Sequence, residues 1–258
     1  MPEPISPPQT DLRHSHTPEA IQARLNSSPQ GIYLREFIYG AVDGTVTTFA
    51  VVSGVAGAGL SSGVVIVLGL ANLIADGFSM AVSAFHGIRA EEEIRERVRQ
   101  EEHDHIAQYP AGEREEIRQI FAAKGFEGDL LEDIVTVITA DEKRWVQTMV
   151  QDEHGLALEG PNGFKAACAT FIAFLLAGSV PLIVFLIDYF APGSITTPFA
   201  VSSAMTGVAF FGIGALKSRF VERTWYSAGI ETLLAGAAAS GLAWIVGWLL
   251  RGVVAPGV

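Results

Sequence analysis

Five long apolar segments constrain the fold of this chain more than any other feature of its sequence. Each has roughly the 20 residues that a membrane-spanning helix needs, and each is nearly uncharged and rich in Gly, Ala and Ser, as closely packed membrane helices are. Buried helices of a soluble protein would instead show polar stripes at helical spacing. The sequence therefore predicts an all-α integral membrane protein with five transmembrane helices. They are expected at residues 37–60, 63–88, 164–190, 199–216 and 226–250.

The insert between the second and third spans, residues 89–160, is strongly acidic. It holds 19 Asp or Glu against 9 Lys or Arg, so nearly all of the net charge of −11 is local to it. No Gly or Pro interrupts the chain between the second span and Pro110, and we expect one long helix there. Shorter helices are expected at 113–123, 128–139 and 141–154. Because local negative charge attracts cations, the sequence predicts a helical metal-binding insert and no nucleic-acid partner.

The placement of Lys and Arg predicts how the chain lies in the bilayer, because short cytoplasmic loops carry an excess of positive residues. Basic residues precede the first span and lie between the fourth and fifth, whereas the links on the other side have none. We therefore expect the tail at 1–33 and the insert to be cytoplasmic, with the spans in 34–88 and 161–258. No plant or fungal targeting signal is recognised, so a bacterial inner membrane is expected. The basic residues are Arg13, Arg24, Arg35, Lys217, Arg219 and Arg223.

Candidate metal ligands in the insert occur in pairs three or four residues apart, which places both members of a pair on one helix face. Carboxylate and imidazole ligands suit Fe²⁺ and Mn²⁺, and a thioether adds preference for softer ions over Mg²⁺ or Ca²⁺. The competing interpretation is a solvated charged face, which we favour for the glutamates at 91–93 and 96 because they alternate with Arg. The predicted ligand pairs are Glu102 with His105, Glu113 with Glu116, and Met149 with Glu153.

Glu102 and His105 also leave a second chemistry open, because Glu-x-x-His is the spacing found in di-iron helical bundles. A ferritin-like oxidase would need a second such motif on another helix, whereas His154 directly follows Glu153. A membrane-anchored di-iron ferroxidase and a metal-buffering membrane protein without transport are therefore the alternative functions. No prosthetic group is expected, since divalent metal ions would be the substrate.

Two of the apolar segments contain polar side chains, which are costly in a bilayer unless they line a cavity or an ion path. Asp43 lies about two turns inside the first span, and the alternative role for it is an ion pair with Arg35. In the second span polar and thioether side chains recur every four residues, which places them on one stripe. We predict a pathway of hard and soft ligands formed by Asp43 together with Asn72, Asp76 and Met80.

The motifs around these residues resemble the vacuolar iron transporter family over about 34–250. They are Tyr-Gly-Ala-Val-Asp-Gly at 39–44, Ala-Asn-Leu-Ile-Ala-Asp-Gly-Phe-Ser-Met at 71–80, and five spans with an insert after the second. The resemblance implies a homodimer whose ion path lies at the dimer interface and is lined by Asp43 and Met80. It also implies a metal-binding insert that uses Glu102, Glu113, Glu116, Glu153 and Met149. Two residues depart from the pattern of the family. At the position of His105 the family ordinarily has Glu, and at the position of Asn72 some relatives have an acidic residue.

The sequence and the resemblance together predict a homodimeric transporter that moves Fe²⁺ out of the cytoplasm, with Mn²⁺, Co²⁺ and Zn²⁺ as further candidate ions. The insert would collect ions, and the pathway residues would carry them across. The resemblance implies proton antiport, with Asp43 as the proton carrier. An odd number of spans excludes a simple inverted repeat in one chain, so a symmetric pore requires a dimer. Gly40 and Gly44 are expected to form a close-contact face for that dimer.

Overall fold

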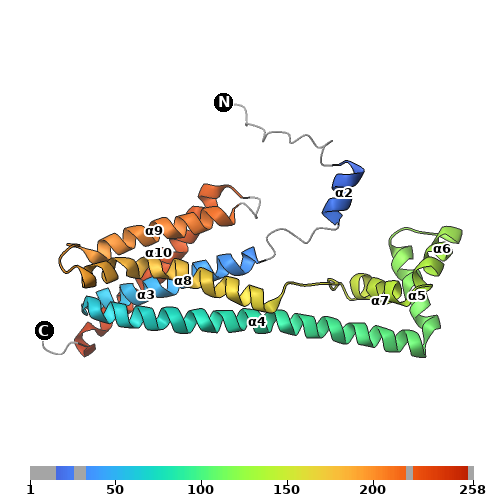
Figure 1. The fold of residues 1–258 in the computed structure, drawn as a ribbon, viewed down its shortest axis with the longest axis horizontal. Coiled ribbons are helices and arrows are strands. Elements are labelled where there is room, and N and C mark those ends of the chain that lie inside the picture. The colour runs from blue at the N-terminus through green and yellow to red at the C-terminus, as the bar shows by residue number, and fades with distance from the viewer. Residues whose placement is uncertain (1–15, 26–32, 219–222, 255–258) are drawn as a thin grey trace, which may run out of the picture.

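The computed structural model describes residues 16–25, 33–218 and 223–254, and the regular elements in these ranges are helices (Figure 1). Five of them are long and apolar enough to cross a membrane, which confirms the predicted fold class. The tail contributes a short helix, α2 (Pro18–Leu25), while Arg13, Arg219 and the side chain of Arg24 lie outside the described part. The membrane helices are α3 (Leu34–Gly57), α4 (Ser62–Gln108), α8 (Gly163–Phe190), α9 (Pro198–Lys217) and α10 (Trp225–Val254).

Helix α3 is the central element of the membrane bundle, because it contacts all four other membrane helices, and α8 packs against both α3 and α4. Helix α10 packs against α3 and α9, and α9 also contacts α8. Lipid is as apolar as a leucine side chain, so a bundle of this kind is stabilised by close van der Waals packing more than by removal of apolar surface from water. The buried side chains of its core include Phe49, Val52, Leu73, Phe174, Leu182 and Phe210.

Gly40 and Gly44 lie where α3 approaches α8 most closely, which corrects the prediction that they form a contact face between two chains. A Cβ atom on residue 40 would meet the backbone of Thr170, and one on residue 44 would meet the backbone and ring of Phe174. Both glycines are buried within the single chain. Small residues allow close approach of helices within a protomer just as between protomers, so the sequence pattern could not separate the two cases.

The Gly44→Val variant is therefore expected to destabilise the bundle of the single chain. The added carbon atoms would force α3 away from the backbone of α8, and overpacking of this kind costs about 1–3 kcal/mol. The melting temperature of the detergent-solubilised protein should fall by several degrees. Gly212→Val is the matched control, because no described residue lies within 4 Å of a Cβ atom at that position. Equal melting temperatures for the two variants would contradict the assignment of Gly44 to the α3–α8 contact.

Helix α4 connects the membrane bundle to the insert. It has 47 residues, which correspond to a length of about 70 Å, more than twice the roughly 30 Å of a bilayer core. Figure 1 shows it running uninterrupted along the whole molecule, as predicted for the start of the insert. After Tyr109 the chain turns, and Pro110 begins the next helix at a position where its missing N–H is no loss. The insert continues with α5 (Pro110–Ala123), α6 (Gly128–Thr139), α7 (Glu142–Thr148) and a π-helical turn (Met149–Glu153).

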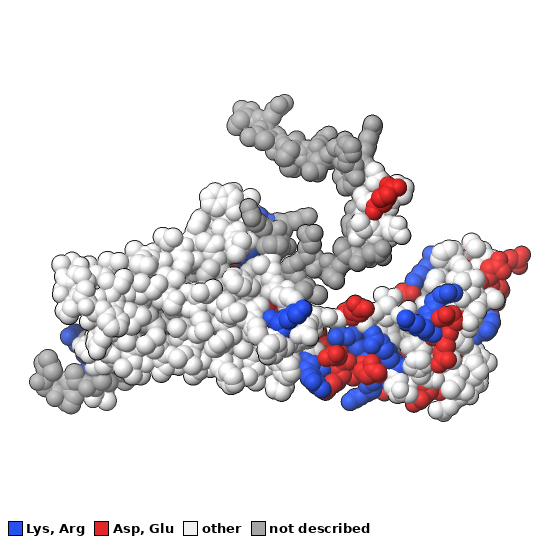
Figure 2. Space-filling model, in the orientation of Figure 1, with Lys and Arg blue, Asp and Glu red and all other residues white. Residues whose placement is uncertain are grey.

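The insert has a small hydrophobic core of its own. Side chains from α5, α6, α7 and the π-helical turn meet in it, and its buried members are Ile117, Val135, Ile138, Trp145 and Met149. The outer surface is different, because Figure 2 shows Lys, Arg, Asp and Glu covering the insert, whereas the visible face of the membrane bundle is almost free of them. A charged shell around an apolar core is the pattern of a helical domain in water.

Candidate metal sites

Two buried carboxylates lie in the insert, one on α4 and one on α5. Glu102 is 2% exposed and Glu113 is 6% exposed. In each of them one oxygen, Oε2, is buried and has no hydrogen-bond partner within residues 16–25, 33–218 and 223–254. Leaving a polar atom buried and unpaired costs about 1–3 kcal/mol, and more for a charged group. A bound cation would remove this cost, so the two carboxylates have the character of ligands.

Glu102 belongs to two groups of possible ligands. It joins His105 and Glu113 in the first group and Glu153 and His154 in the second, and the ligand atoms of each group lie within 4.8 Å of one another. Nε2 of His154 is 2.9 Å from Oε1 of Glu102, and Nδ1 of His105 is 3.6 Å from Oε1 of Glu113. Because Glu102 is shared, the insert offers ligands for two adjacent ions with one carboxylate between them.

His154 reaches this site through the π-helical turn. His154 is not among the predicted ligands, because it directly follows Glu153 and consecutive residues of an α-helix point about 100° apart. In the structure the N–H of His154 donates to the carbonyl oxygen of Met149 at 3.2 Å, an i to i+5 bond that widens the turn. The sequence does not signal this turn. The only available hint was a further histidine in an acidic segment.

Two other predicted ligands, Glu116 and Met149, are outside both groups of possible ligands. Glu116 belongs to neither group of ligands, but its charge acts on both Glu113 and Glu153. Met149 is fully buried in the core of the insert, on the same π-helical turn as Glu153. Metal ligation by Glu116 and Met149 stays a prediction.

Burial and mutual repulsion favour protonation of this cluster in the absence of metal. Burial, followed by the charges of Glu116 and Glu102, raises the pKa of Glu113 to about 7. Burial and the charge of Glu102 also raise the pKa of Glu153, and the hydrogen bond to Glu102 raises the pKa of the His154 imidazole. A divalent cation would therefore compete with protons for these ligands and relieve the repulsion between the carboxylates.

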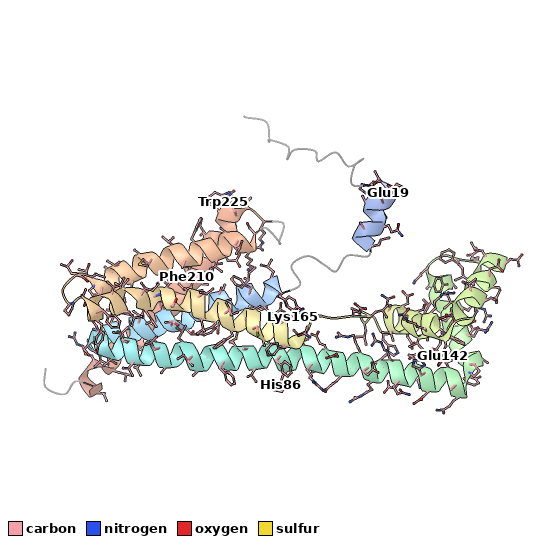
Figure 3. The ribbon with its side chains drawn as sticks, in the orientation of Figure 1. Glu19, His86, Glu142, Lys165, Phe210 and Trp225 are labelled. Carbon is pink, nitrogen blue, oxygen red and sulfur yellow. The ribbon has the colours of Figure 1, made fainter. Side chains whose placement is uncertain are left out.

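Several charged side chains elsewhere on the insert form ion pairs at its surface. Glu93 and Glu96 pair with Arg89 and Arg99, as expected for a solvated helix face. Exposed pairs of this kind contribute about 0–1 kcal/mol to stability, and they need no metal. The carboxylates of Glu102 and Glu113 differ from these, because each has a buried oxygen without a partner among the described residues. Further surface pairs are Arg118 with Glu132, Lys124 with Asp152, and His103 with Glu142, whose position Figure 3 marks.

In the membrane bundle, Asp43 of α3 and Met80 of α4 line one cavity of about 470 Å³. Asp76 lies close enough for its charge to act on Asp43. Asn72 is half-buried, and its Nδ2 atom is buried with no hydrogen-bond partner in the described part of the chain. The structure thus brings Asp43, Asp76 and Met80 near one another, while Asn72 lies one turn farther along α4, at about 6 Å.

The same cavity contains charged residues that sequence reasoning did not place in the pathway. Lys217 from α9 and Glu231 from α10 both line it, and Glu231 forms an ion pair of 2.8 Å with Arg223. Arg35, the alternative partner considered for Asp43, forms its described ion pair with Glu36 instead. The carboxylate of Asp43 therefore faces the cavity without that arginine.

Known proteins are similar to this chain over nearly its whole length. The model of the VIT family matches residues 34–248, from the start of α3 into α10. A vacuolar iron transporter of Plasmodium berghei (strain Anka) is 28% identical over 244 residues, which are 92% of this chain and 89% of that protein. A vacuolar iron transporter of Toxoplasma gondii is 30% identical over 250 residues, 95% of this chain and 82% of that protein. Vacuolar iron transporter 1 of Arabidopsis thaliana is 28% identical over 240 residues, 93% and 92% of the two chains. The chain belongs to the VIT family.

Proposed function

We propose that this chain transports divalent transition-metal ions, Fe²⁺ first among them, across a membrane. The observation that carries the proposal is the cavity in the membrane bundle that Asp43 and Met80 share, with Asp76 nearby. A membrane anchor needs no carboxylates and no thioether around a cavity, and polar groups within membrane helices are costly. The names of the relatives in two distant groups of organisms, vacuolar iron transporters, agree with this function.

The insert would collect the ions. Its two groups of carboxylate and imidazole ligands suit Fe²⁺, and also Mn²⁺, Co²⁺ and Zn²⁺, which are the further candidate ions. Because α4 runs from the insert directly into the membrane bundle, ions concentrated by the insert are released near the end of the cavity that contains Met80. This arrangement supports a role for the insert in supply and a separate role for the bundle in translocation.

Transport out of the cytoplasm is the direction that we propose. The excess of basic residues before α3 and between α9 and α10 supports a cytoplasmic tail and insert, so the ligands of the insert would load from that side. A bacterial inner membrane is the proposed location. We further propose that protons move in the opposite direction and that Asp43 carries them, since it faces the same cavity as the metal path.

The transporter would act as a homodimer whose contact face includes α4. Gly40 and Gly44 are used within the chain, so another close-contact face is needed. Along α4, small side chains recur every four residues at exposed positions, which is the pattern of membrane helices that pack closely against a partner. They lie beside the stripe of Asp76 and Met80, so a second chain on this face would enclose that stripe. The small residues are Ala71, Ala75, Ser79 and Ser83.

A membrane-anchored di-iron ferroxidase is the second candidate, and one observation favours it. Glu102 is shared between a group that contains His105 and a group that contains His154, and a carboxylate between two histidine-bearing sites resembles the ligand set of di-iron bundles. This alternative explains the insert, but it gives no role to Asp43, Asp76 and Met80.

Uptake of Fe²⁺ by sealed proteoliposomes under anoxic conditions tests the proposed function. We expect uptake above that of protein-free vesicles, and an imposed pH gradient should accelerate it when protons leave the compartment that accumulates iron. Absence of uptake, with metal still bound by the protein and Fe²⁺ consumed once oxygen is admitted, would instead assign the function to an oxidase in the insert. Absence of uptake without oxygen consumption would leave a metal buffer.

A further inference from the structure

We propose that Glu36, in the first turn of α3, is a metal ligand that forms a waiting site with Met80 between the insert and Asp43. This inference rests on the proposed transport function and extends its pathway by one residue. An acidic side chain in the first turn of a helix is usually a solvated group that interacts favourably with the helix dipole. Glu36 is not solvated, because only 6% of it is exposed.

The two oxygens of Glu36 have different surroundings. Oε1 accepts a hydrogen bond from Nε of Arg35 at 3.0 Å and lies 2.9 Å from Nη2 of the same guanidinium. Oε2 is buried and has no hydrogen-bond partner among the residues that the structure describes. The side chain of Arg35 is 64% exposed, so the ion pair accounts for the solvent side of the carboxylate but not for its buried side. The carboxylate therefore holds an unused acceptor directed into the protein.

Glu36 lines a cavity of about 270 Å³ together with Met80, Tyr39 and Glu91. Tyr39 and Met80 also line the larger cavity that contains Asp43. The thioether of Met80 thus lies on the boundary between the two cavities. An ion that leaves Glu36 would meet this soft ligand before it reaches the carboxylate of Asp43, and such an alternation of hard and soft ligands suits a first-row divalent ion.

The geometry of α3 supports two successive sites. Glu36 and Asp43 are seven residues apart, close to two helical turns, so they lie on nearly the same face and about 10 Å apart along the axis. Glu36 is the nearer of the two to the insert, since α3 begins at the end of the bundle where α8 starts, beside the labelled Lys165 (Figure 3). Glu91, also on the cavity, lies where α4 begins its path through the insert.

Arg35 would compete with the metal ion for Glu36. Removing Glu36 and removing Arg35 should therefore change uptake in opposite directions, which a purely structural ion pair would not do. We expect Glu36→Gln to raise the Fe²⁺ concentration for half-maximal uptake about tenfold, as loss of a supporting carboxylate does at other metal sites. Arg35→Gln should lower that concentration about threefold, because it removes a like charge from beside the ion. If the pair only stabilises the helix start, both variants will lower the melting temperature alike and leave half-maximal uptake unchanged, which would overturn the proposal.

Two exposed charges near the same end of the bundle provide matched controls. Glu92→Gln removes a carboxylate from α4, and Lys165→Gln removes a cation from the start of α8. Both should leave half-maximal uptake unchanged, which separates ligation by Glu36 from a general change of surface charge. Effects as large as those of Glu36→Gln and Arg35→Gln would overturn the assignment to one site.

Direct binding distinguishes failure of this inference from failure of the transport function. In full-length protein that carries Glu113→Ala and Glu116→Ala, Mn²⁺ binding should weaken further on Glu36→Gln and strengthen on Arg35→Gln. If wild-type vesicles show no uptake but binding changes in these opposite directions, the waiting site stands and transport falls. If vesicles show uptake but neither uptake nor Mn²⁺ binding responds to Glu36→Gln, transport stands and the waiting site falls.

Discussion

The Asp43→Asn variant should lose Fe²⁺ flux about 100-fold or more while the insert binds metal as before. Asn has the size and shape of Asp but no charge, so a divalent ion in the cavity shared with Met80 would lose one of the carboxylates that neutralise it. Each uncompensated charge in a bilayer interior costs about 2.5–3.5 kcal/mol even on the most lenient scale, and about 3 kcal/mol corresponds to a rate loss of about 100-fold. Proteoliposome uptake measures the flux, and metal titration of the solubilised protein measures binding.

Asp188→Asn is the matched control for this loss, because Asp188 is another aspartate of the membrane helices and lies near the opposite end of α8. Its Oδ1 accepts a hydrogen bond from the N–H of Gly193 at 3.3 Å, a role that the Asn side-chain oxygen can also fill. Its flux should match that of the wild type. Wild-type flux in Asp43→Asn would remove Asp43 from the path, and loss of metal binding in that variant would point to a folding defect.

The arrangement of helices was largely readable from the sequence. Hydropathy located the five spans because the bilayer imposes both a length and a composition on each of them. The long α4 could be predicted because no Gly or Pro separates its membrane part from Glu102. What hydropathy could not assign was which neighbour each helix face contacts, and Gly40 and Gly44 therefore pointed to a second chain when they actually face α8.

Helical spacing predicts which candidate ligands share a face only where the chain is a regular α-helix. Spacing predicted a ligand pair of Glu102 and His105, and the structure places both in one group of possible ligands. It could not find His154, because a π-helical turn changes the phase of the chain at that point. Glu36 escaped notice for another reason: an acidic residue in a first helical turn looks like an ordinary helix start, and only its burial and its unpaired oxygen distinguish it.

In the insert, Glu102→Gln should abolish binding of two ions at once, because both groups of ligands contain Glu102. We expect the affinity of each group for Fe²⁺ or Mn²⁺ to fall about 100-fold, at the upper end of the losses seen when carboxylates that support a metal site are removed. Glu113→Gln should be milder, since it leaves Glu102, Glu153 and His154 in place. Titration of the full-length protein should therefore show one ion fewer in Glu113→Gln than in the wild type, and two fewer in Glu102→Gln, at the same metal concentration.

A stability measurement separates ligation by Glu102 from a purely structural role. The charge of Glu102 repels those of Glu113 and Glu153, while the amide oxygen of Gln can still accept the hydrogen bond from His154. Metal-free Glu102→Gln should therefore melt no lower than the metal-free wild type, yet it should lose the rise in melting temperature that bound metal gives. Glu101→Gln, on the exposed neighbour, should keep both the affinity and that rise. A lower melting temperature in metal-free Glu102→Gln, with the metal-induced rise intact, would assign Glu102 to the fold of the insert rather than to its metals.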